Sequence, residues 1–328
     1  MRGKGINYDT GFSPAGHLSR PVFDPGQVER EMRVIAEDLH CTAVRISGGD
    51  PERLSVAARL AAAAGLQVWF APFPCELSPE ENLALLSDCA GRAEQVRETG
   101  AEVVFVAGCE LSLFGRGFVP GEIFMDRIEN LGRADFRALN ARLSEYLATV
   151  VKEVRGRFNG KVTYAAGPWE FIDWTPFDIV SVDGYRDAGN RDRFAGEIKG
   201  LSRYGKPVAI TEFGCCAYRG AADKGGMGWM IIDPSVMPPV LDGDYVRDEG
   251  EQVRYLTELL EIFSGAGVDT AFWFTFAGYQ TPRNNDDPRR DLDLASYGLV
   301  AILDDNGTDW QPKEAFHALA AAYGRTEQ

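Results

Sequence analysis

The chain has 328 residues, 45% of them hydrophobic, and its 34 basic and 49 acidic residues give a net charge of −15. The acidic balance argues against nucleic acids and anionic membranes as partners, because both require a basic face on the protein. The N-terminus shows no charged-then-apolar signal segment, and no apolar run approaches the length of about 18 residues that a membrane span needs. We therefore expect a cytoplasmic protein with no membrane partner.

The expected strands are short apolar runs separated by helical stretches. Val208, Ala209 and Ile210 are typical of a strand buried on both faces, as in a parallel sheet covered by helices. In chain order, the eight expected strands cover 3–8, 42–47, 66–71, 102–107, 161–166, 177–182, 208–210 and 269–276.

Helix start signals stand between these runs. Asp24 and Asp50 are N-cap residues followed directly by proline, and Ser78 with Glu81 has the spacing of a capping box. The alternation of strands and helices predicts an α/β fold, a single (β/α)₈ TIM barrel that covers residues 1–328 as one catalytic domain. The expected helices cover 25–40, 51–64, 78–100, 134–158, 191–204, 249–265 and 312–323.

Two connections exceed the usual length, 214–248 after the seventh strand and 277–298 after the eighth. Loops this long in a compact fold are usually functional. Because Trp229 and other aromatic residues are costly to expose in a free loop, we expect 214–248 to be ordered over the barrel mouth. A disordered insertion is the alternative, and it suits 277–298 better.

Two glutamates end barrel strands, Glu110 after the fourth and Glu212 after the seventh. The carboxyl ends of the strands form the working face of an α/β barrel, so these side chains are expected across the mouth from each other. Glycoside hydrolysis needs such a pair, one carboxyl group protonating the leaving oxygen and the other attacking the anomeric carbon or activating water. Apolar neighbours would raise the pKa of Glu110, and Arg45 at the end of strand two would keep Glu212 ionised.

Further polar and aromatic residues follow the ends of other strands and are candidates for binding or orienting a substrate. Trp169 is expected to stack on a sugar, and Glu170 competes with Glu110 as acid/base or serves as a subsite residue. The remaining candidates are Asn7, Asp9, Asp183, Tyr185, Trp229 and Trp273.

With Glu110, the run Ile210-Thr-Glu212-Phe-Gly, Arg45 and Trp273, the chain resembles the clan A glycoside hydrolases; the tail Tyr297-Gly-Leu299 and the later Pro312-Lys313 are also similar. The resemblance covers the whole barrel. It implies a retaining mechanism with Glu110 as acid/base and Glu212 as nucleophile. It also implies that Arg45 and Tyr185 orient the nucleophile and that Trp273 forms the floor of a sugar subsite.

One position departs from the clan. Most members have Asn directly before the acid/base, where it binds the substrate 2-hydroxyl, and this chain has Cys109, whose thiol is a poor donor. The difference points away from the usual glucosides and galactosides, to a mannanase-like branch or an unfamiliar sugar. The chain also resembles uncharacterised bacterial proteins with an abortive-infection label, which implies no mechanism.

Each candidate has a structural alternative. Glu212 can be an ion-pair partner of Arg45 in an inert barrel, Glu110 a loop carboxylate, Asp183 a cap and Trp273 a core residue. The six cysteines follow no disulfide or zinc spacing, and only three histidines accompany them, so we predict free thiols, no metal and no cofactor. The expected partner is a carbohydrate.

Two functions are left open, and a third is not supported. The first is a retaining glycosidase, and the same residues would also support transglycosylation if water is excluded. The second is a carbohydrate-binding or phage-defence-associated barrel without turnover. A serine or metal hydrolase lacks support because the sequence contains no nucleophile-elbow motif and no histidine cluster.

Overall fold

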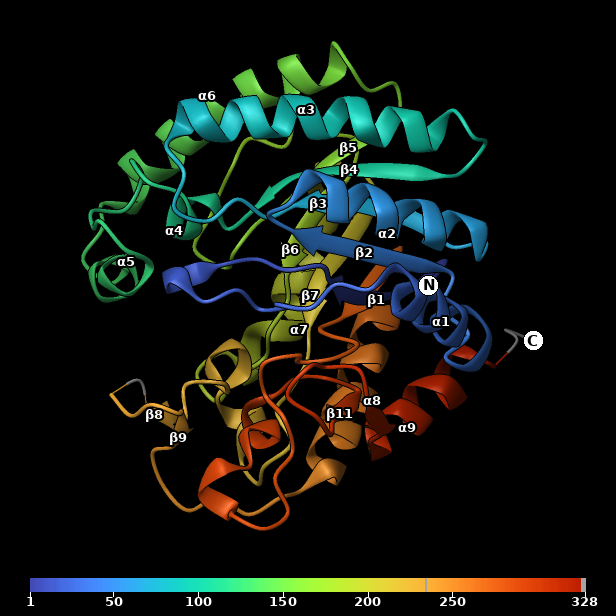
Figure 1. Ribbon diagram of the computed structural model, residues 1–328. Helices are drawn as coiled ribbons and strands as arrows, with labels where there is room; N and C mark the ends of the chain where they lie inside the picture. Colours follow the sequence, from blue (N-terminus) through green and yellow to red (C-terminus); the bar gives the residue numbers. More distant parts are fainter. Residues whose placement is uncertain (234, 326–328) are drawn as a thin grey trace.

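A parallel sheet of eight strands forms the centre of the computed structural model, which describes residues 1–233 and 235–325 (Figure 1). The strands lie in the order β5-β4-β3-β2-β1-β10-β7-β6. Backbone hydrogen bonds between Ala166 and the β6 residues Ser181 and Asp183 (3.2 and 2.9 Å) join the two ends of the sheet and close the barrel. The strands are β1 Gly3–Asp9, β2 Ala43–Gly48, β3 Gln67–Pro72, β4 Val103–Cys109, β5 Lys161–Ala165, β6 Val180–Asp183, β7 Val208–Phe213 and β10 Thr270–Trp273. The predicted TIM barrel is confirmed.

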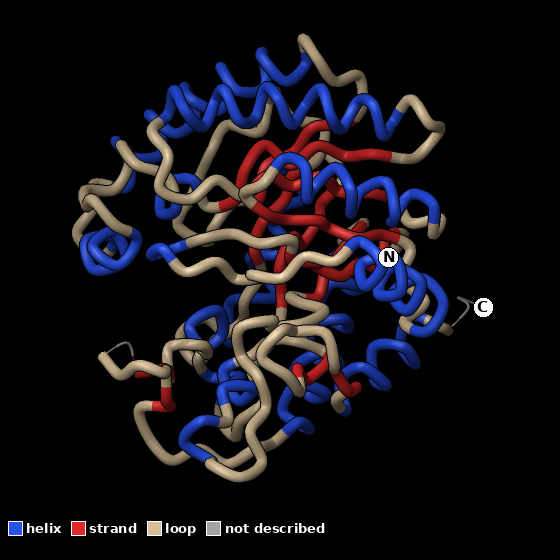
Figure 2. The backbone as a smooth tube through the Cα atoms, in the orientation of Figure 1, coloured by secondary structure: helices blue, strands red, loops and turns tan. Residues whose placement is uncertain are grey.

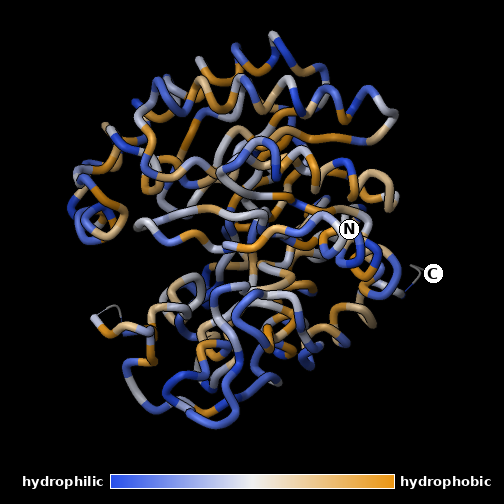
Figure 3. The backbone as a smooth tube through the Cα atoms, viewed as in Figure 1, coloured by the Kyte–Doolittle hydropathy of each residue, from blue (hydrophilic) through white to orange (hydrophobic). Residues whose placement is uncertain are grey.

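Helices surround the barrel, with the strands at the centre (Figure 2). Along the outer helices hydrophobic and hydrophilic residues alternate (Figure 3), as expected for helices that bury one face against the sheet. The helices are α1 Pro25–Arg33, α2 Pro51–Ala63, α3 Pro79–Arg97, α4 Leu111–Phe114, α5 Phe124–Leu131, α6 Phe136–Arg155, α7 Arg191–Gly200, α8 Glu249–Ala266 and α9 Glu314–Tyr323. No described helix is long and apolar enough to cross a membrane.

Several predicted boundaries are wrong. The first helix ends at Arg33 and continues as a π-helical turn over Val34–Asp38, and the sixth strand begins at Val180. Within the described chain no helix lies between β5 and β6, so the strict alternation fails there. Pro312 ends the short strand β12 (Trp310–Pro312), which pairs with β11 (Val300–Ile302), and the last helix begins at Glu314.

The interior of the barrel is filled by side chains. Trp69 and Phe272 meet edge to face with ring centroids 4.8 Å apart, and both are fully buried. Gly5 makes room for this packing, because a Cβ atom there would lie 2.4 Å from the ring of Phe272. The barrel is therefore a packed core rather than a pore, and a ligand has to enter from one end.

Both long connections are ordered in their described residues. The 214–248 connection contains the hairpin β8 (Ile232–Asp233) and β9 (Val240–Leu241), and the ring of Tyr218 is buried. The 277–298 connection is held at Asp293, a buried carboxylate that accepts from Arg247 (2.7 Å), Arg283 (3.0 Å) and Lys313 (2.8 Å). These ion pairs contradict the alternative of a disordered insertion for 277–298.

Candidate active site

Glu110 is presented by an unusual turn at the end of β4. Gly108 has φ +103° and Glu110 has φ +42°. Residues other than glycine rarely adopt a positive φ. The pairing of β4 with β5 also shifts register between Val106 and Cys109. Register shifts and strained residues occur often at functional sites, where they redirect a side chain. The turn therefore marks Glu110 as a candidate functional residue independently of its side-chain type.

The carboxyl group of Glu110 lies in surroundings that favour its neutral form. Burial is the largest cause that raises its pKa well above the usual value, and the acidic groups of Asp183, Glu212 and Glu170 raise it further, against an opposite contribution from Arg45. Within the described chain no donor bonds its carboxyl oxygens. Both its burial and its acidic neighbours therefore favour the protonated form of Glu110.

Glu212 at the end of β7 is held by two donors from other strands. Arg45 Nη1 on β2 donates to its Oε1 at 2.6 Å, and the Tyr185 hydroxyl after β6 donates to its Oε2 at 3.0 Å. Arg45 is 1% exposed and also donates to Asn7 Oδ1 at 2.7 Å. Asn7 is fixed in turn by its bond to the Thr211 carbonyl at 2.9 Å. The orientation of the Glu212 carboxyl group is therefore fixed by side chains from two other strands or their ends.

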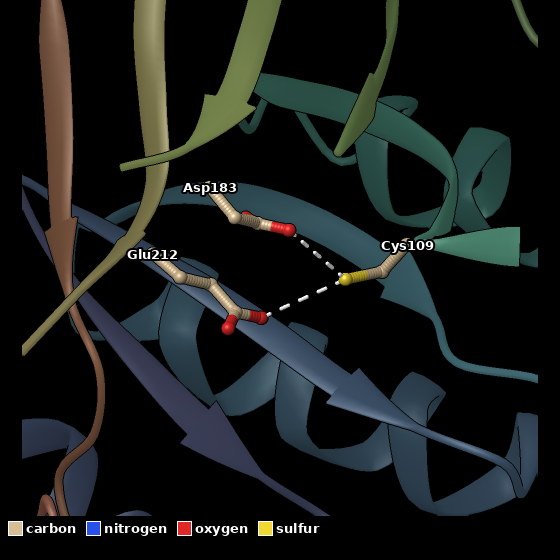
Figure 4. Close-up of side chains that lie close together, drawn as sticks. All are labelled: Cys109, Asp183 and Glu212. Atoms are coloured by element: carbon tan, nitrogen blue, oxygen red, sulfur yellow. Dashed lines mark hydrogen bonds between the residues drawn. The ribbon is translucent and has the colours of Figure 1, made fainter. Parts of the chain in front are cut away.

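Cys109 and Asp183 complete the centre of the site (Figure 4). The Cys109 thiol lies 3.5 Å from Asp183 Oδ2 and 3.7 Å from Glu212 Oε1. Burial, followed by the charge of Glu212, raises the pKa of Asp183 well above its usual value, although Arg45 acts in the opposite direction. Burial likewise raises the pKa of the Cys109 thiol. Arg45 is the one guanidinium that the described structure brings to these acidic groups, and it pairs with Glu212 at 2.6 Å.

The ligand atoms of Cys109, Asp183 and Glu212 lie within 4.8 Å of one another, close enough to hold a metal ion. The Glu212 oxygen that faces the thiol already accepts from Arg45. A guanidinium in that position repels a cation, and structural zinc sites usually have four protein ligands. The raised pKa values of Cys109 and Asp183 and the nearby guanidinium suit a group of protonated side chains better than a metal site.

Replacing Asp183 by asparagine is expected to stabilise the protein increasingly as the pH rises above about 4. Folding raises the pKa of this carboxyl group, so the folded protein keeps a proton that the unfolded chain has lost. The free energy of unfolding of the wild type therefore falls between the unfolded and the folded pKa, and the variant lacks this loss. Urea unfolding across the pH range measures the difference.

The control for this measurement is Asp173→Asn. Its exposed carboxylate accepts from the backbone of Thr175 at 2.9 Å, and bonds from Thr175 lower its pKa. The Asp173 carboxylate stabilises the folded protein above the unfolded pKa, and this stabilisation is lost as the pH falls. Asp173→Asn should therefore be less stable than wild type at neutral pH, the opposite of Asp183→Asn. A constant difference between Asp183→Asn and wild type would show that Asp183 does not retain its proton on folding.

The wall beside Glu110 is built around Glu170. This buried carboxylate accepts from the backbone of Ser112 (3.0 Å) and Gly167 (3.0 Å) and from the Tyr164 hydroxyl (2.8 Å). Its hydrogen bonds tie the α4 turn to the end of β5, so Glu170 positions this wall, and its own part in catalysis or substrate binding stays a prediction.

Trp169 lies in the same wall, and its ring is partly buried. Its indole nitrogen donates to the Ser112 hydroxyl at 2.9 Å. Gly167 separates the ring from the acid, since a Cβ atom there would lie 2.8 Å from Trp169 Cζ2 and 3.0 Å from Glu110 Oε1. Trp169 is thus the predicted aromatic residue placed next to Glu110.

Of the three predicted residues that remain, Asp9 and Trp273 are buried and Trp229 is partly buried. Asp9 is buried and accepts from the backbone of Gly11 at 2.7 Å, which fixes the turn after β1. Trp273 is 0% exposed, donates to the Tyr297 carbonyl at 3.0 Å and packs edge-on against Phe213. With no exposed ring face, Trp273 is a core residue here, which contradicts its predicted place as a sugar-stacking floor. Trp229 is partly buried in the 214–248 connection.

Sequence reasoning missed the part that Tyr297 plays. Its hydroxyl donates to the Gly225 carbonyl at 2.7 Å and accepts from the Gly228 backbone at 2.9 Å, and its ring meets Tyr185 edge to face. Tyr297 thus joins the 277–298 and 214–248 connections next to Tyr185, the residue whose hydroxyl donates to Glu212. The Tyr297-Gly-Leu299 run was its only signal in the sequence.

Fold and site together define an α/β TIM barrel with a buried acid and an ion-paired carboxylate at the carboxyl ends of β4 and β7. Among solved structures, it is similar to a GH113 β-mannanase from Alicyclobacillus acidocaldarius, with a TM-score of 0.61 and 18% identity, covering 98% of this chain and 97% of that one. A β-glycosidase from Thermosphaera aggregans has a TM-score of 0.55 and 8% identity, covering 98% and 95%. Cel5A from Thermotoga maritima, in complex with cellobiose, has a TM-score of 0.53 and 16% identity, covering 90% and 96%.

Identities this low establish the shared fold and nothing finer. No family model matches the sequence, and no curated protein matches it. The resemblance to proteins with an abortive-infection label finds no support in these comparisons.

Proposed function

We propose that residues 1–328 form one catalytic domain, a retaining glycoside hydrolase with Glu110 as acid/base and Glu212 as nucleophile. The observation that carries the proposal is the contrast between the two carboxyl groups. Burial and neighbouring acids raise the pKa of Glu110 well above its usual value, while Arg45 and Tyr185 donate to Glu212. A buried carboxyl group with a raised pKa and a second carboxyl group held by two donors suit an acid and a nucleophile.

The names of the similar solved structures, a β-mannanase and a β-glycosidase, support a carbohydrate as substrate. In the first step Glu110 protonates the leaving oxygen while Glu212 Oε attacks the anomeric carbon, giving a glycosyl-enzyme. In the second step Glu110 takes a proton from water, which attacks the same carbon and releases Glu212. Arg45 and Tyr185 keep the attacking carboxylate in place through both steps.

The test is hydrolysis of a broad panel of aryl α- and β-glycosides, pyranose and furanose, by the wild type, with the first-formed anomer identified by NMR. We expect one glycoside class to be cleaved with retention of configuration. Inversion would assign Glu212 as a general base instead of a nucleophile. Saturable sugar binding that survives Glu212→Gln, without any product, would mean that the barrel only binds.

A further inference from the structure

The exposed large apolar side chains are confined to one end of the barrel. In the part of the chain that the structure describes, each lies in a connection that follows the carboxyl end of a strand, or at the first residue of the helix after it. Among the described residues, the connections that lead from a helix back to the next strand carry no exposed large apolar side chain, and neither do the α-helices beyond their first residue. These residues are Leu18, Val22, Ile123, Phe136, Phe171, Met227, Met230, Val236, Met237, Val246 and Leu303.

The 214–248 connection holds the largest share of them. Met227, Met230, Val236 and Met237, which we call the methionine segment, are 47%, 40%, 38% and 74% exposed. Three of the six methionines of the chain are therefore exposed side chains of this one connection. Methionine is flexible and polarisable, so it suits apolar surfaces that adapt to a ligand. In Figure 1 the β8–β9 hairpin of this connection projects on the side of the barrel to which the arrowhead of β2 points.

The base of the methionine segment is fixed to the candidate active site. A Cβ atom at Gly226 would lie 3.2 Å from the ring of Tyr185, whose hydroxyl bonds Glu212. The Tyr218 hydroxyl donates to the Gly228 carbonyl at 3.0 Å. Because Met227 lies between these two anchored glycines, the exposed apolar side chains begin directly beside the residue that holds the nucleophile.

The chemistry of the surface selects among its possible occupants. The net charge of −15 opposes an anionic membrane surface. A plain polysaccharide would need donors and acceptors where this segment presents thioether and aliphatic groups. Continuity with Tyr185 and Glu212 points to the part of a substrate that leaves the site on cleavage.

We propose that the substrate is a glycoside with an extended apolar aglycone, such as an alkyl chain, which lies along the methionine segment. The inference rests on the proposed glycosidase function and adds its substrate class.

The test is calorimetric binding of n-hexyl, n-octyl and n-decyl β-glucosides, galactosides and mannosides, below their micelle concentrations, to Glu212→Gln, which cannot turn them over. A buried methylene contributes about 0.8 kcal/mol, so the dissociation constant should fall by up to about fourfold per methylene for at least one head group. Adding Met227→Ser and Met237→Ser should flatten this dependence. Leu303→Ser, a matched exposed site elsewhere on the same end of the barrel, should leave it unchanged.

Affinity independent of chain length for all three head groups would overturn the proposal, as would a dependence that persists in the double methionine variant. Binding to neutral phosphatidylcholine vesicles without any preference for alkyl glycosides would also overturn it, by assigning the surface to a membrane. Since binding is read without turnover, a wild type that hydrolyses no glycoside would defeat the proposed function and leave this measurement intact.

Discussion

Replacing Glu212 by alanine is expected to lower kcat on the best aryl glycoside by on the order of 10⁵-fold. A loss of this size raises the activation free energy by about 7 kcal/mol. The substitution removes the carboxylate that Arg45 and Tyr185 hold at 2.6 and 3.0 Å. Neither donor can replace the missing nucleophile. Steady-state kinetics on purified wild type and variant measure the loss.

The same variant offers a specific rescue. Azide can enter the space left by the side chain and attack the anomeric carbon from the same face as the lost carboxylate, so the product should be a glycosyl azide of inverted configuration. Tyr185→Phe is the graded control, because it removes one hydrogen bond to Glu212 and should cost about 10- to 100-fold. Undiminished turnover in Glu212→Ala would rule out Glu212 as the nucleophile.

The sequence placed Glu110 and Glu212 correctly at the ends of β4 and β7, because each follows an apolar run that the sequence pattern shows. Arg45, predicted at the end of the second strand, instead lies within β2 (Ala43–Gly48) and reaches Glu212 from there. Which side chains of different strands contact each other was harder to predict from the sequence. Cys109 and Asp183 lie 74 positions apart, and the register shifts on β4 and β6 decide that their side chains meet. A shift of one residue reverses the face of a side chain, and no local pattern announces it.

Trp273 is a case in which a register shift made a prediction from the sequence wrong. The resemblance to clan A implied that Trp273 forms the floor of a sugar subsite, but the pairing of β10 with β7 shifts register between Ala271 and Trp273. The ring then lies against Phe213 in the core. The missed helix α5 and the β11–β12 pair lie inside connections, where packing against the barrel rather than local propensity decides the conformation.

Replacing Glu110 by glutamine is expected to have an effect that depends on the leaving group. Acid catalysis contributes roughly 10²- to 10⁴-fold, and a nitrophenol leaving group needs it least. The first step on an alkyl glycoside should therefore lose close to the full amount, and the first step on a nitrophenyl glycoside much less. Comparing kcat/KM for the two substrates in wild type and variant measures this difference.

The pH profile tests the same assignment. Because the proposed mechanism requires the acid form of Glu110 and its pKa is raised, kcat/KM of the wild type should stay high well above the usual carboxyl pKa and fall as the pH passes the raised value. Glu110→Gln cannot lose this proton, so the alkaline fall should disappear. Asp183→Asn is the matched control: the pKa of this neighbour of Glu212 is also raised, but Asp183 is not the proposed acid, so the fall should persist in that variant. An alkaline fall that survives in Glu110→Gln and vanishes in Asp183→Asn would transfer the role of acid to Asp183, which reaches the thiol of Cys109 on the same side of Glu212.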